Sequence, residues 1–255
     1  KSEEGLGVFW RLLKDADVVV QNFRKDVAER LGVGYEQVRQ RRPDIIYASL
    51  NTYGQMGSWA SRPGHEQIAQ AATGMQERFG GDGQPLTQPF AVNDYGTGFM
   101  GAYGVALALL HRQKTGRVQH LDTALAYTAC TLQSRFLQDY AGKNWEEPRG
   151  QNSVGTGPLN RAYEAKDGWV FIAGRNNDLR ALATIDGFAG VDGLSNDDLA
   201  HFLEQHLMDS TVSQWVDRLT SVGIGAHRVI EQSRELLEDP WVVRHGLSVT
   251  REHSG

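Results

Sequence analysis

Ile45-Ile46-Tyr47-Ala48-Ser49-Leu50 is a mostly apolar stretch with the length and composition of a buried β-strand. A second such stretch, Ala16–Val20, precedes it. Helical patterns over Glu3–Lys14 and Val27–Arg41 come before each of them. Strands and helices that alternate at this spacing are typical of parallel α/β units. The sequence therefore predicts an α/β fold for residues 1–140.

The stretch 141–158 divides the chain into two predicted domains. Its four glycines and two prolines are typical of a linker. Residues 159–230 then predict a smaller α+β domain, in which a hairpin formed by Asn160–Ala165 and Trp169–Ala173 is followed by three helices. Because the chain opens with Lys1 rather than Met and enters a helical pattern at once, we expect it to be part of a longer protein.

Charge and cysteine content exclude several classes of function. The chain has 26 Lys and Arg against 31 Asp and Glu, so we expect no basic face for nucleic acid or an acidic membrane. No apolar run approaches the roughly 18 residues that cross a membrane. The single cysteine, Cys130, lies in a helical pattern over Leu121–Leu137, where we expect an inert buried thiol. We therefore expect a cytoplasmic protein that binds a small molecule or another protein.

Asp94, in the stretch Pro89–Gly98, is the carboxylate that we single out for chemistry. The pattern over Phe99–Leu110 is apolar on nearly every side and predicts a buried helix. The N-terminal end of such a helix offers unpaired N–H groups and the positive end of the macrodipole, which stabilise anions. The alternative is that Asp94 only caps the helix, and these residues alone favour the cap.

Two further polar clusters follow the predicted strands. Gln21–Arg24 follows the first strand, with Arg30 shortly after it, and Arg62–Glu66 lies in the loop after the second strand. Parallel strands share one carboxyl edge, so we expect both clusters and Asp94 at that edge, where arginines suit a phosphorylated ligand. A solvated helix face is the alternative for the arginines. His65 is either a general base or an ordinary loop histidine.

Other site classes find no support in the sequence. It has no Walker-type phosphate loop, no paired cysteines with zinc spacing and no Gly-Xaa-Ser-Xaa-Gly nucleophile elbow. We therefore predict no metal site.

Several spaced motifs together point to one family. They are Asp15-Ala16-Asp17-Val18-Val19-Val20-Gln21-Asn22-Phe23-Arg24, Ala28–Gly32, Gly54-Gln55-Met56-Gly57, Arg62–Glu66, Asp94 with Thr97-Gly98, Thr115–Gln119, and Tyr163 with Asp167-Gly168-Trp169. In this order they resemble class III CoA-transferases, the superfamily of carnitine dehydratase, bile acid-inducible F and α-methylacyl-CoA racemase. The resemblance extends over nearly all 255 residues.

The resemblance implies a Rossmann-like parallel-sheet large domain, of which this chain carries only part, and a smaller α+β domain. Residues 231–255 would begin the segment that returns to the large domain. It also implies an interlocked homodimer. Acyl-CoA and a small carboxylic acid would be the substrates, with no prosthetic group.

The resemblance also assigns roles to individual residues. Asn22, Phe23 and Arg24 match residues that hold the thiol arm and phosphates of CoA, Arg30 matches a phosphate contact and Arg62 a basic contact near CoA. Asp94 matches the catalytic aspartate. It would attack the acyl-CoA thioester to give a mixed anhydride, and the returning thiolate would give an aspartyl-CoA thioester. Backbone N–H groups of Gly96–Gly98 are expected to stabilise the oxyanions.

Two alternatives remain beside the transferase. In the racemase branch a histidine at the position of His65 works with the aspartate on opposite faces of the substrate α-carbon. That branch adds a glutamate from the small domain, for which the best match here is Asn176, so we prefer the transferase. Gly155-Thr156-Gly157 would have to serve as the glycine-rich loop of some transferases. The third hypothesis is a catalytically silent module for CoA binding or dimerisation.

Overall fold

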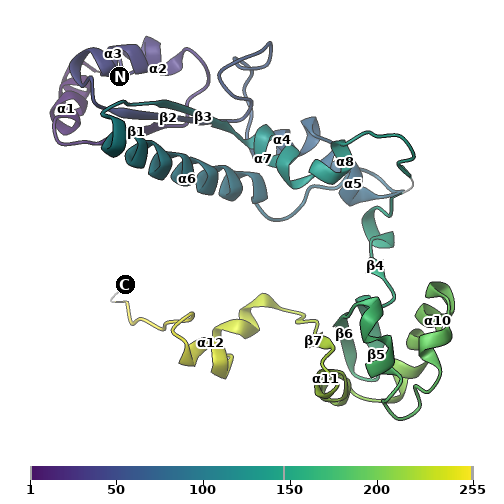
Figure 1. Ribbon diagram of the computed structural model, residues 1–255. Helices are drawn as coiled ribbons and strands as arrows, with labels where there is room; N and C mark the ends of the chain where they lie inside the picture. Colours follow the sequence, from purple (N-terminus) through teal and green to yellow (C-terminus); the bar gives the residue numbers. More distant parts are fainter. Residues whose placement is uncertain (1, 146, 254–255) are drawn as a thin grey trace. The chain divides into compact units, whose positions relative to one another are not determined.

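The computed structural model describes residues 2–145 and 147–253, so the predicted domain limits at residues 1 and 255 lie outside the described residues. The chain forms two compact units that divide between Asn152 and Ser153 (Figure 1). This division falls inside the stretch 141–158 that the sequence predicts as a linker.

The first unit is built on a parallel sheet of three strands, in the order β1 (Val18–Gln21), β2 (Ile46–Asn51) and β3 (His120–Ala124). The central strand β2 is buried at every position except Leu50, as expected for a parallel strand covered on both faces. The prediction of an α/β fold with a parallel sheet is confirmed.

Helices cover both faces of this sheet (Figure 1). One face carries α1 (Glu3–Leu13), α2 (Val27–Arg30) and α3 (Tyr35–Arg41). A core forms there from Leu13, Val38, Ile45 and Tyr47. The long helix α6 (Val92–Thr115) covers the other face. The remaining helices of the unit are α4 (Glu66–Ala72), α5 (Met75–Gly80), α7 (Leu125–Leu132), α8 (Ser134–Leu137) and a 3₁₀ turn over Gly150–Asn152.

One predicted helix is broken by a turn, because the pattern Val27–Arg41 divides into α2 and α3. A turn also separates α4 from α5. A glycine with positive φ lies at each break, Gly32 at +79° and Gly74 at +79°. Glycine adopts this left-handed conformation without the steric cost of a Cβ, and it commonly ends a helix.

The prediction for Leu121–Leu137 is partly wrong. Residues 120–124 form the strand β3, paired with β2, and the helix begins only at Leu125. A stretch of five residues is too short for its periodicity to distinguish a strand from the start of a helix. Cys130 lies on α7 but is exposed rather than buried, so the expectation of a buried thiol is also wrong.

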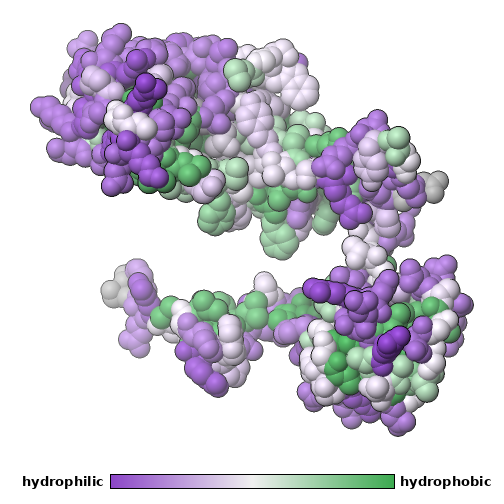
Figure 2. All heavy atoms as spheres, in the orientation of Figure 1, coloured by the Kyte–Doolittle hydropathy of each residue, from purple (hydrophilic) through white to green (hydrophobic). Residues whose placement is uncertain are grey.

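Helix α6 differs from the prediction in its start and in its packing. It begins at Val92, so Asp94 lies inside its first turn. Small residues face the sheet: Gly101 is buried, and a Cβ there would lie 2.8 Å from Leu50 Cδ2. The large apolar side chains point outward, with Phe99 77% exposed and Tyr103 62% exposed. In the described residues α6 is therefore not buried on all sides, and Figure 2 shows apolar side chains along this side of the unit.

The direction of α6 follows from contacts near its C-terminal end. Arg112 donates to the carbonyl of Asp44 at 2.9 Å and pairs with Asp17 at 2.5 Å, at the amino ends of β2 and β1. The helix therefore runs antiparallel to the strands. Its N-terminal turn, with Asp94, lies toward the carboxyl edge of the sheet.

The second unit is an antiparallel sheet with helices. Its strands β4 (Gly155–Gly157), β5 (Asn160–Ala165), β6 (Gly168–Ala173) and β7 (Gly225–Arg228) pair in that order, and β5–β6 is the predicted hairpin. The helices are α9 (Leu179–Leu182), α10 (Asn196–His206), α11 (Val212–Ser221) and α12 (Pro240–Arg244), with 3₁₀ turns over Asn176–Asp178, Val191–Gly193, Leu207–Asp209 and Ser233–Leu237. Tyr163, Phe188 and Trp215 are among the residues of its core. The expected α+β character is confirmed for this unit.

Candidate active site

Loops at the carboxyl edge of the sheet carry the predicted site residues. Asn22–Arg24 directly follows β1, and the loop from Thr52 to His65 follows β2. Helix α6 brings Asp94 toward the same edge from the opposite direction. Ligands of open α/β sheets bind at this edge, so the topology gathers residues that are far apart in the sequence.

Glu66 is the buried centre of the site. It is the first residue of α4 and only 3% exposed. Its Oε1 accepts hydrogen bonds from Asn93 Nδ2 at 2.9 Å and Gln70 Nε2 at 2.8 Å. Its Oε2 accepts the backbone N–H of Asp94 at 2.7 Å. A buried carboxylate thus uses both oxygens to fix the first turn of α6 on the start of α4.

Sequence reasoning included Glu66 in a polar cluster but gave it no role. A signal was present: Glu66 and Gln70 fall on the same helical face as Ala69, and all three are buried. Polar residues one turn apart on an apolar face are expected to be paired when buried. Glu66 is paired with Asn93, and the backbone N–H of Gln88 donates to Gln70 Oε1 at 2.9 Å.

The side chain of Asp94 is exposed, and its backbone is held from behind by Glu66. Partial burial raises the pKa of the Asp94 carboxyl above its ordinary value of 3.8. The negative charge of Glu66 raises this pKa further, and His65 lowers it. Asp94 makes no side-chain cap of α6, whose N-cap residue is Ala91. The capping alternative is therefore wrong, and the carboxylate is left accessible.

His65 lies at the N-cap of α4, immediately before Glu66. It is exposed, and its Nδ1 lies 2.7 Å from Gln67 Oε1. Because the next residue, Glu66, accepts the backbone N–H of Asp94, the structure brings the two predicted catalytic residues into one neighbourhood.

The expectation that the backbone N–H groups of Gly96–Gly98 stabilise the oxyanions is wrong. Gly96–Gly98 lies inside α6, where backbone N–H groups bond to carbonyls four residues earlier. These N–H groups are therefore committed to the helix. A Cβ at Gly96 would lie 2.5 Å from Thr128 Cγ2, so this glycine instead serves the close packing of α6 on α7.

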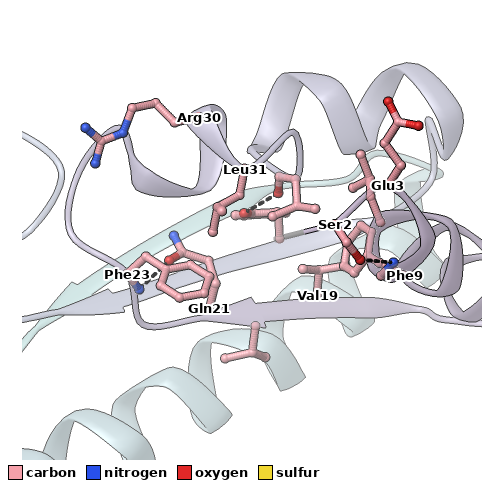
Figure 3. A pocket seen from close by; sticks show the side chains of 13 residues that line it. Ser2, Glu3, Phe9, Val19, Gln21, Phe23, Arg30 and Leu31 are labelled. Atoms are coloured by element: carbon pink, nitrogen blue, oxygen red, sulfur yellow. Dashed lines mark hydrogen bonds between the residues drawn. The ribbon is translucent and has the colours of Figure 1, made fainter.

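A cavity of about 740 Å³ lies on the α1–α3 face of the sheet. Figure 3 shows Phe23, Gln21 and Arg30 toward one end, with Ser2 and Glu3 toward the other. Its walls are mainly apolar: Leu6, Phe9, Val19, Val20, Leu31, Val33 and Tyr47 are among the lining residues. Among the predicted CoA residues of the described chain, Phe23 and Arg30 line this cavity, whereas Asn22, Arg24 and Arg62 do not.

Arg62 lies elsewhere at the edge, in the loop after β2. Its guanidinium lies 4.9 Å from the centre of the Trp59 ring, and Trp59 meets Tyr53 edge to face at 5.6 Å. The same loop is fixed at its start by Asn51, whose Oδ1 accepts the N–H of Gly54 at 2.6 Å. Asp122 of β3 accepts the N–H of Gln55 at 2.8 Å. The loop that carries Arg62 and His65 is therefore anchored to both β2 and β3.

Two features predicted for the small domain, one residue and one glycine-rich stretch, lie in the second unit. Asn176 begins a 3₁₀ turn after β6, and Gly155-Thr156-Gly157 forms β4. β4 is paired with β5, so this glycine stretch is a strand rather than a free loop.

Comparison with known proteins decides the family. The sequence pattern of "CoA-transferase family III" matches residues 1–255. The chain belongs to this family. The prediction of the family from its motifs is thereby confirmed.

Three relatives show how this family III chain compares. It is 29% identical over 267 residues to succinate–glutarate CoA-transferase of Agrobacterium fabrum, covering 99% of this chain and 66% of the relative. It is 33% identical over 177 residues to human alpha-methylacyl-CoA racemase, covering 68% of this chain and 46% of the relative. The crystal structure of a hypothetical protein from Mycobacterium tuberculosis superimposes with a TM-score of 0.82 at 26% identity, covering 100% of this chain and 73% of that one.

The family III chain spans between about a quarter and two thirds of the length of the first curated relatives it matches. Of the helices that the structure describes, none combines the length and the apolar character needed to span a bilayer.

Proposed function

We propose that the protein is a class III CoA-transferase that moves CoA from an acyl-CoA donor to a carboxylic acid, with Asp94 as the nucleophile. The observation that carries the proposal is the buried carboxylate of Glu66, which fixes the backbone of Asp94 while the Asp94 side chain stays exposed. A nucleophile needs both properties, a fixed position and access to substrate.

The chemistry would proceed by covalent catalysis. An Asp94 carboxylate oxygen attacks the thioester carbonyl carbon, the C–S bond breaks, and CoA leaves as the thiolate, giving a mixed anhydride. The thiolate then attacks the Asp94 acyl carbon and releases the donor acid. The acceptor carboxylate attacks the resulting aspartyl-CoA thioester, and the same steps in reverse release the new acyl-CoA and restore Asp94.

The cavity on the α1–α3 face is the proposed place for part of CoA. Its apolar walls suit an adenine ring or the pantetheine arm, and Arg30 supplies a cation for a phosphate at its rim. Phe23 lies at the end toward the carboxyl edge. Asn22 and Arg24 flank Phe23 and would contact the part of CoA that leads out of the cavity, with Arg62 a further basic contact.

The names of two relatives guide the choice of substrates. They are a succinate–glutarate CoA-transferase and, in Haloarcula hispanica, a succinyl-CoA:mesaconate CoA-transferase at 34% identity over 177 residues. All three acids in these names carry two carboxyl groups. Succinyl-CoA with a dicarboxylic acid is therefore the first donor and acceptor pair to test.

Racemase-type epimerisation is the second candidate function. It is favoured by the neighbourhood of His65 and Asp94 and by the human racemase among the relatives. One residue would remove the α-proton of the acyl-CoA and the other would return a proton to the opposite face. A silent CoA-binding module is the third.

One assay separates these functions. The protein is incubated in ²H₂O with succinyl-CoA and glutarate, and separately with a 2-methylacyl-CoA, and the products are analysed by mass spectrometry. We expect glutaryl-CoA from the first mixture and no exchange of the α-hydrogen in the second. Exchange that is lost in His65→Ala would instead establish the racemase, and CoA binding with neither reaction would establish the silent module.

The assembly is also part of the proposal. The outward face of α6 exposes Tyr95, Phe99, Met100, Tyr103, Leu107 and Leu110. A row of large apolar side chains of this length is typical of a contact surface, and a second copy of the protein is the proposed partner, as expected for an interlocked homodimer. Sedimentation velocity should give the mass of a dimer, and a monomer at micromolar concentration would contradict this. Separately, we propose that the protein is cytoplasmic, as expected from its single cysteine.

A further inference from the structure

A row of hydrogen bonds crosses the sheet from β3 to the loop after β1. The backbone N–H of Phe23 donates to Gln21 Oε1 at 2.6 Å. Gln21 Nε2 donates to Ser49 Oγ at 2.9 Å, and Ser49 Oγ lies 2.9 Å from His120 Nε2. Strand pairing aligns these residues, since Gln21 is opposite Ser49 and Tyr47 is opposite His120. All three strands therefore take part in one connection.

The chemistry of the groups fixes the direction of each hydrogen bond. The N–H of Phe23 must face an acceptor, so the amide oxygen of Gln21 points toward it and the amide NH₂ points toward Ser49. Ser49 Oγ thus accepts from Gln21 and has one proton of its own to donate. His120 Nε2 is placed to receive it, which requires the neutral imidazole with its proton on Nδ1.

The ring of His120 is held in place by aromatic neighbours. It stacks on Tyr35 at 4.5 Å between ring centres with 25° between planes, and it meets the edge of Tyr47 at 5.3 Å. Tyr47 is itself fixed, because its hydroxyl donates to the carbonyl of Val33 at 2.8 Å. Nε2 therefore points at Ser49 from a fixed orientation.

We propose that neutral His120, acting through Ser49 and Gln21, is a positioning residue that holds the loop Asn22–Arg24 in the conformation that receives CoA. The CoA part of this inference rests on the proposed function. The connection itself is a property of the fold, and it ends at the backbone of Phe23, whose side chain lines the cavity.

Protonation of His120 would disturb the connection. His120 Nε2 would then donate to Ser49 Oγ, which already accepts from Gln21, and the Ser49 proton would lose its acceptor. Rotating the Gln21 amide would satisfy Ser49 but would turn an NH₂ group toward the N–H of Phe23. The first arrangement leaves the Ser49 proton without an acceptor, and the second relieves this only by breaking the hydrogen bond to Phe23, so protonation weakens the anchor at Phe23.

The charged and titratable groups around His120 come from four elements. Partial burial of its ring lowers the pKa of His120 below 6.5, although the residue as a whole is exposed, and this outweighs the acidic groups Asp122 on β3, Glu29 on α2 and Glu36 on α3, which raise it. The tyrosines Tyr35 on α3 and Tyr47 on β2 face the ring, and burial raises the pKa of Tyr47 to about 12. A lowered histidine pKa means that the neutral form is favoured in the fold, so the anchor is present at neutral pH and is lost as the pH falls through this lowered pKa.

Three variants of the protein test the inference. His120→Gln keeps an acceptor for Ser49 but does not titrate, His120→Phe keeps the ring stacking without the acceptor, and Ser49→Ala removes the middle of the connection. Protection of the Phe23 amide from hydrogen exchange is measured by NMR at pH 7.5 and at a pH below the His120 pKa, which the NMR titration of the His120 ring gives, relative to the intrinsic exchange rate. The Kd of CoA is measured by calorimetry at the same two values.

In the wild type we expect Phe23 protection to fall and Kd to rise by about two- to tenfold between pH 7.5 and a pH below the pKa of His120, the size of one net hydrogen bond. His120→Phe and Ser49→Ala should show the weakened values at both pH values, and His120→Gln the strong values at both. Titration of the CoA phosphates is common to all variants and cancels in this comparison.

The inference is overturned if Phe23 protection is the same in the wild type, His120→Phe and Ser49→Ala, or if His120→Gln keeps the pH response. Failure of the proposed function looks different: the wild type would not bind CoA, while Phe23 protection would still follow the variants.

Discussion

Asp94→Asn is expected to lower the rate of CoA transfer by about 10³-fold or more, because an amide does not replace a carboxylate as the nucleophile. Intact-mass spectrometry of the wild-type protein with succinyl-CoA should show a covalent adduct that hydroxylamine removes. The same treatment of Asp94→Asn should show none. Binding of CoA, measured by calorimetry, should change little in this variant.

A control variant is tested for the same adduct and for its rate of CoA transfer. Asp139→Asn replaces an exposed aspartate of the same unit and should keep both the adduct and the rate. An adduct that persists in Asp94→Asn would place the nucleophile elsewhere. No adduct in the wild type, despite CoA binding, would turn the interpretation to the racemase or to the silent module.

The pH dependence of the reaction follows from the environment of Asp94. Its pKa is raised by burial and by Glu66, and only the ionised carboxylate is nucleophilic. The acidic limb of kcat/KM should therefore lie at a higher pH than for an ordinary aspartate with a pKa of 3.8.

Glu66→Ala is expected to have the second largest effect, on stability as well as on rate. It removes the acceptor of Asp94 N–H, Asn93 Nδ2 and Gln70 Nε2 in a buried site. Because unsatisfied buried donors cost free energy, the free energy of unfolding should fall by about 2–4 kcal/mol. Urea denaturation measures this, and Glu77→Gln, at an exposed glutamate of α5, should change it by less than about 0.5 kcal/mol.

Glu66→Gln separates the positioning of Asp94 from overall stability. The glutamine side chain has nearly the same shape as glutamate. However, its amide NH₂ must face one of the groups that donate a hydrogen bond to Glu66 in the wild type. The first turn of α6 is therefore held less firmly. Loss of the negative charge also lowers the pKa of Asp94. The acidic limb of kcat/KM should therefore move to lower pH while kcat falls. An unchanged limb in a folded Glu66→Gln protein would contradict the role of Glu66 beside Asp94.

Local sequence pattern predicted the elements that have a clear period or a sharp boundary. The strands at Val18–Gln21 and Ile46–Asn51 and the hairpin β5–β6 are where the residues indicate. Errors occurred where a local pattern fits two structures. Residues 121–124 are included in the helical pattern that follows them, yet they form a strand because β2 offers them a partner.

Helix α6 shows a different limit of sequence reasoning. Its apolar pattern predicts burial on all sides, yet its small residues face the sheet and its large ones face outward. Composition indicates how apolar a helix is, but which side approaches the sheet depends on how closely two backbones pack. That choice left Phe99 and Tyr103 exposed and made the outward face a candidate contact surface.

The sequence by itself determined the family, the α/β class of the first unit, and the candidates Asp94, His65, Phe23 and Arg30. These follow from motifs and periodicity, which are properties of residues close together in the chain. Only the tertiary structure decided what surrounds them. Glu66 meets Asp94 across 28 positions of the sequence, and His120 meets Ser49 across 71. No local period encodes such contacts, because they arise from the order and direction in which strands and helices pack.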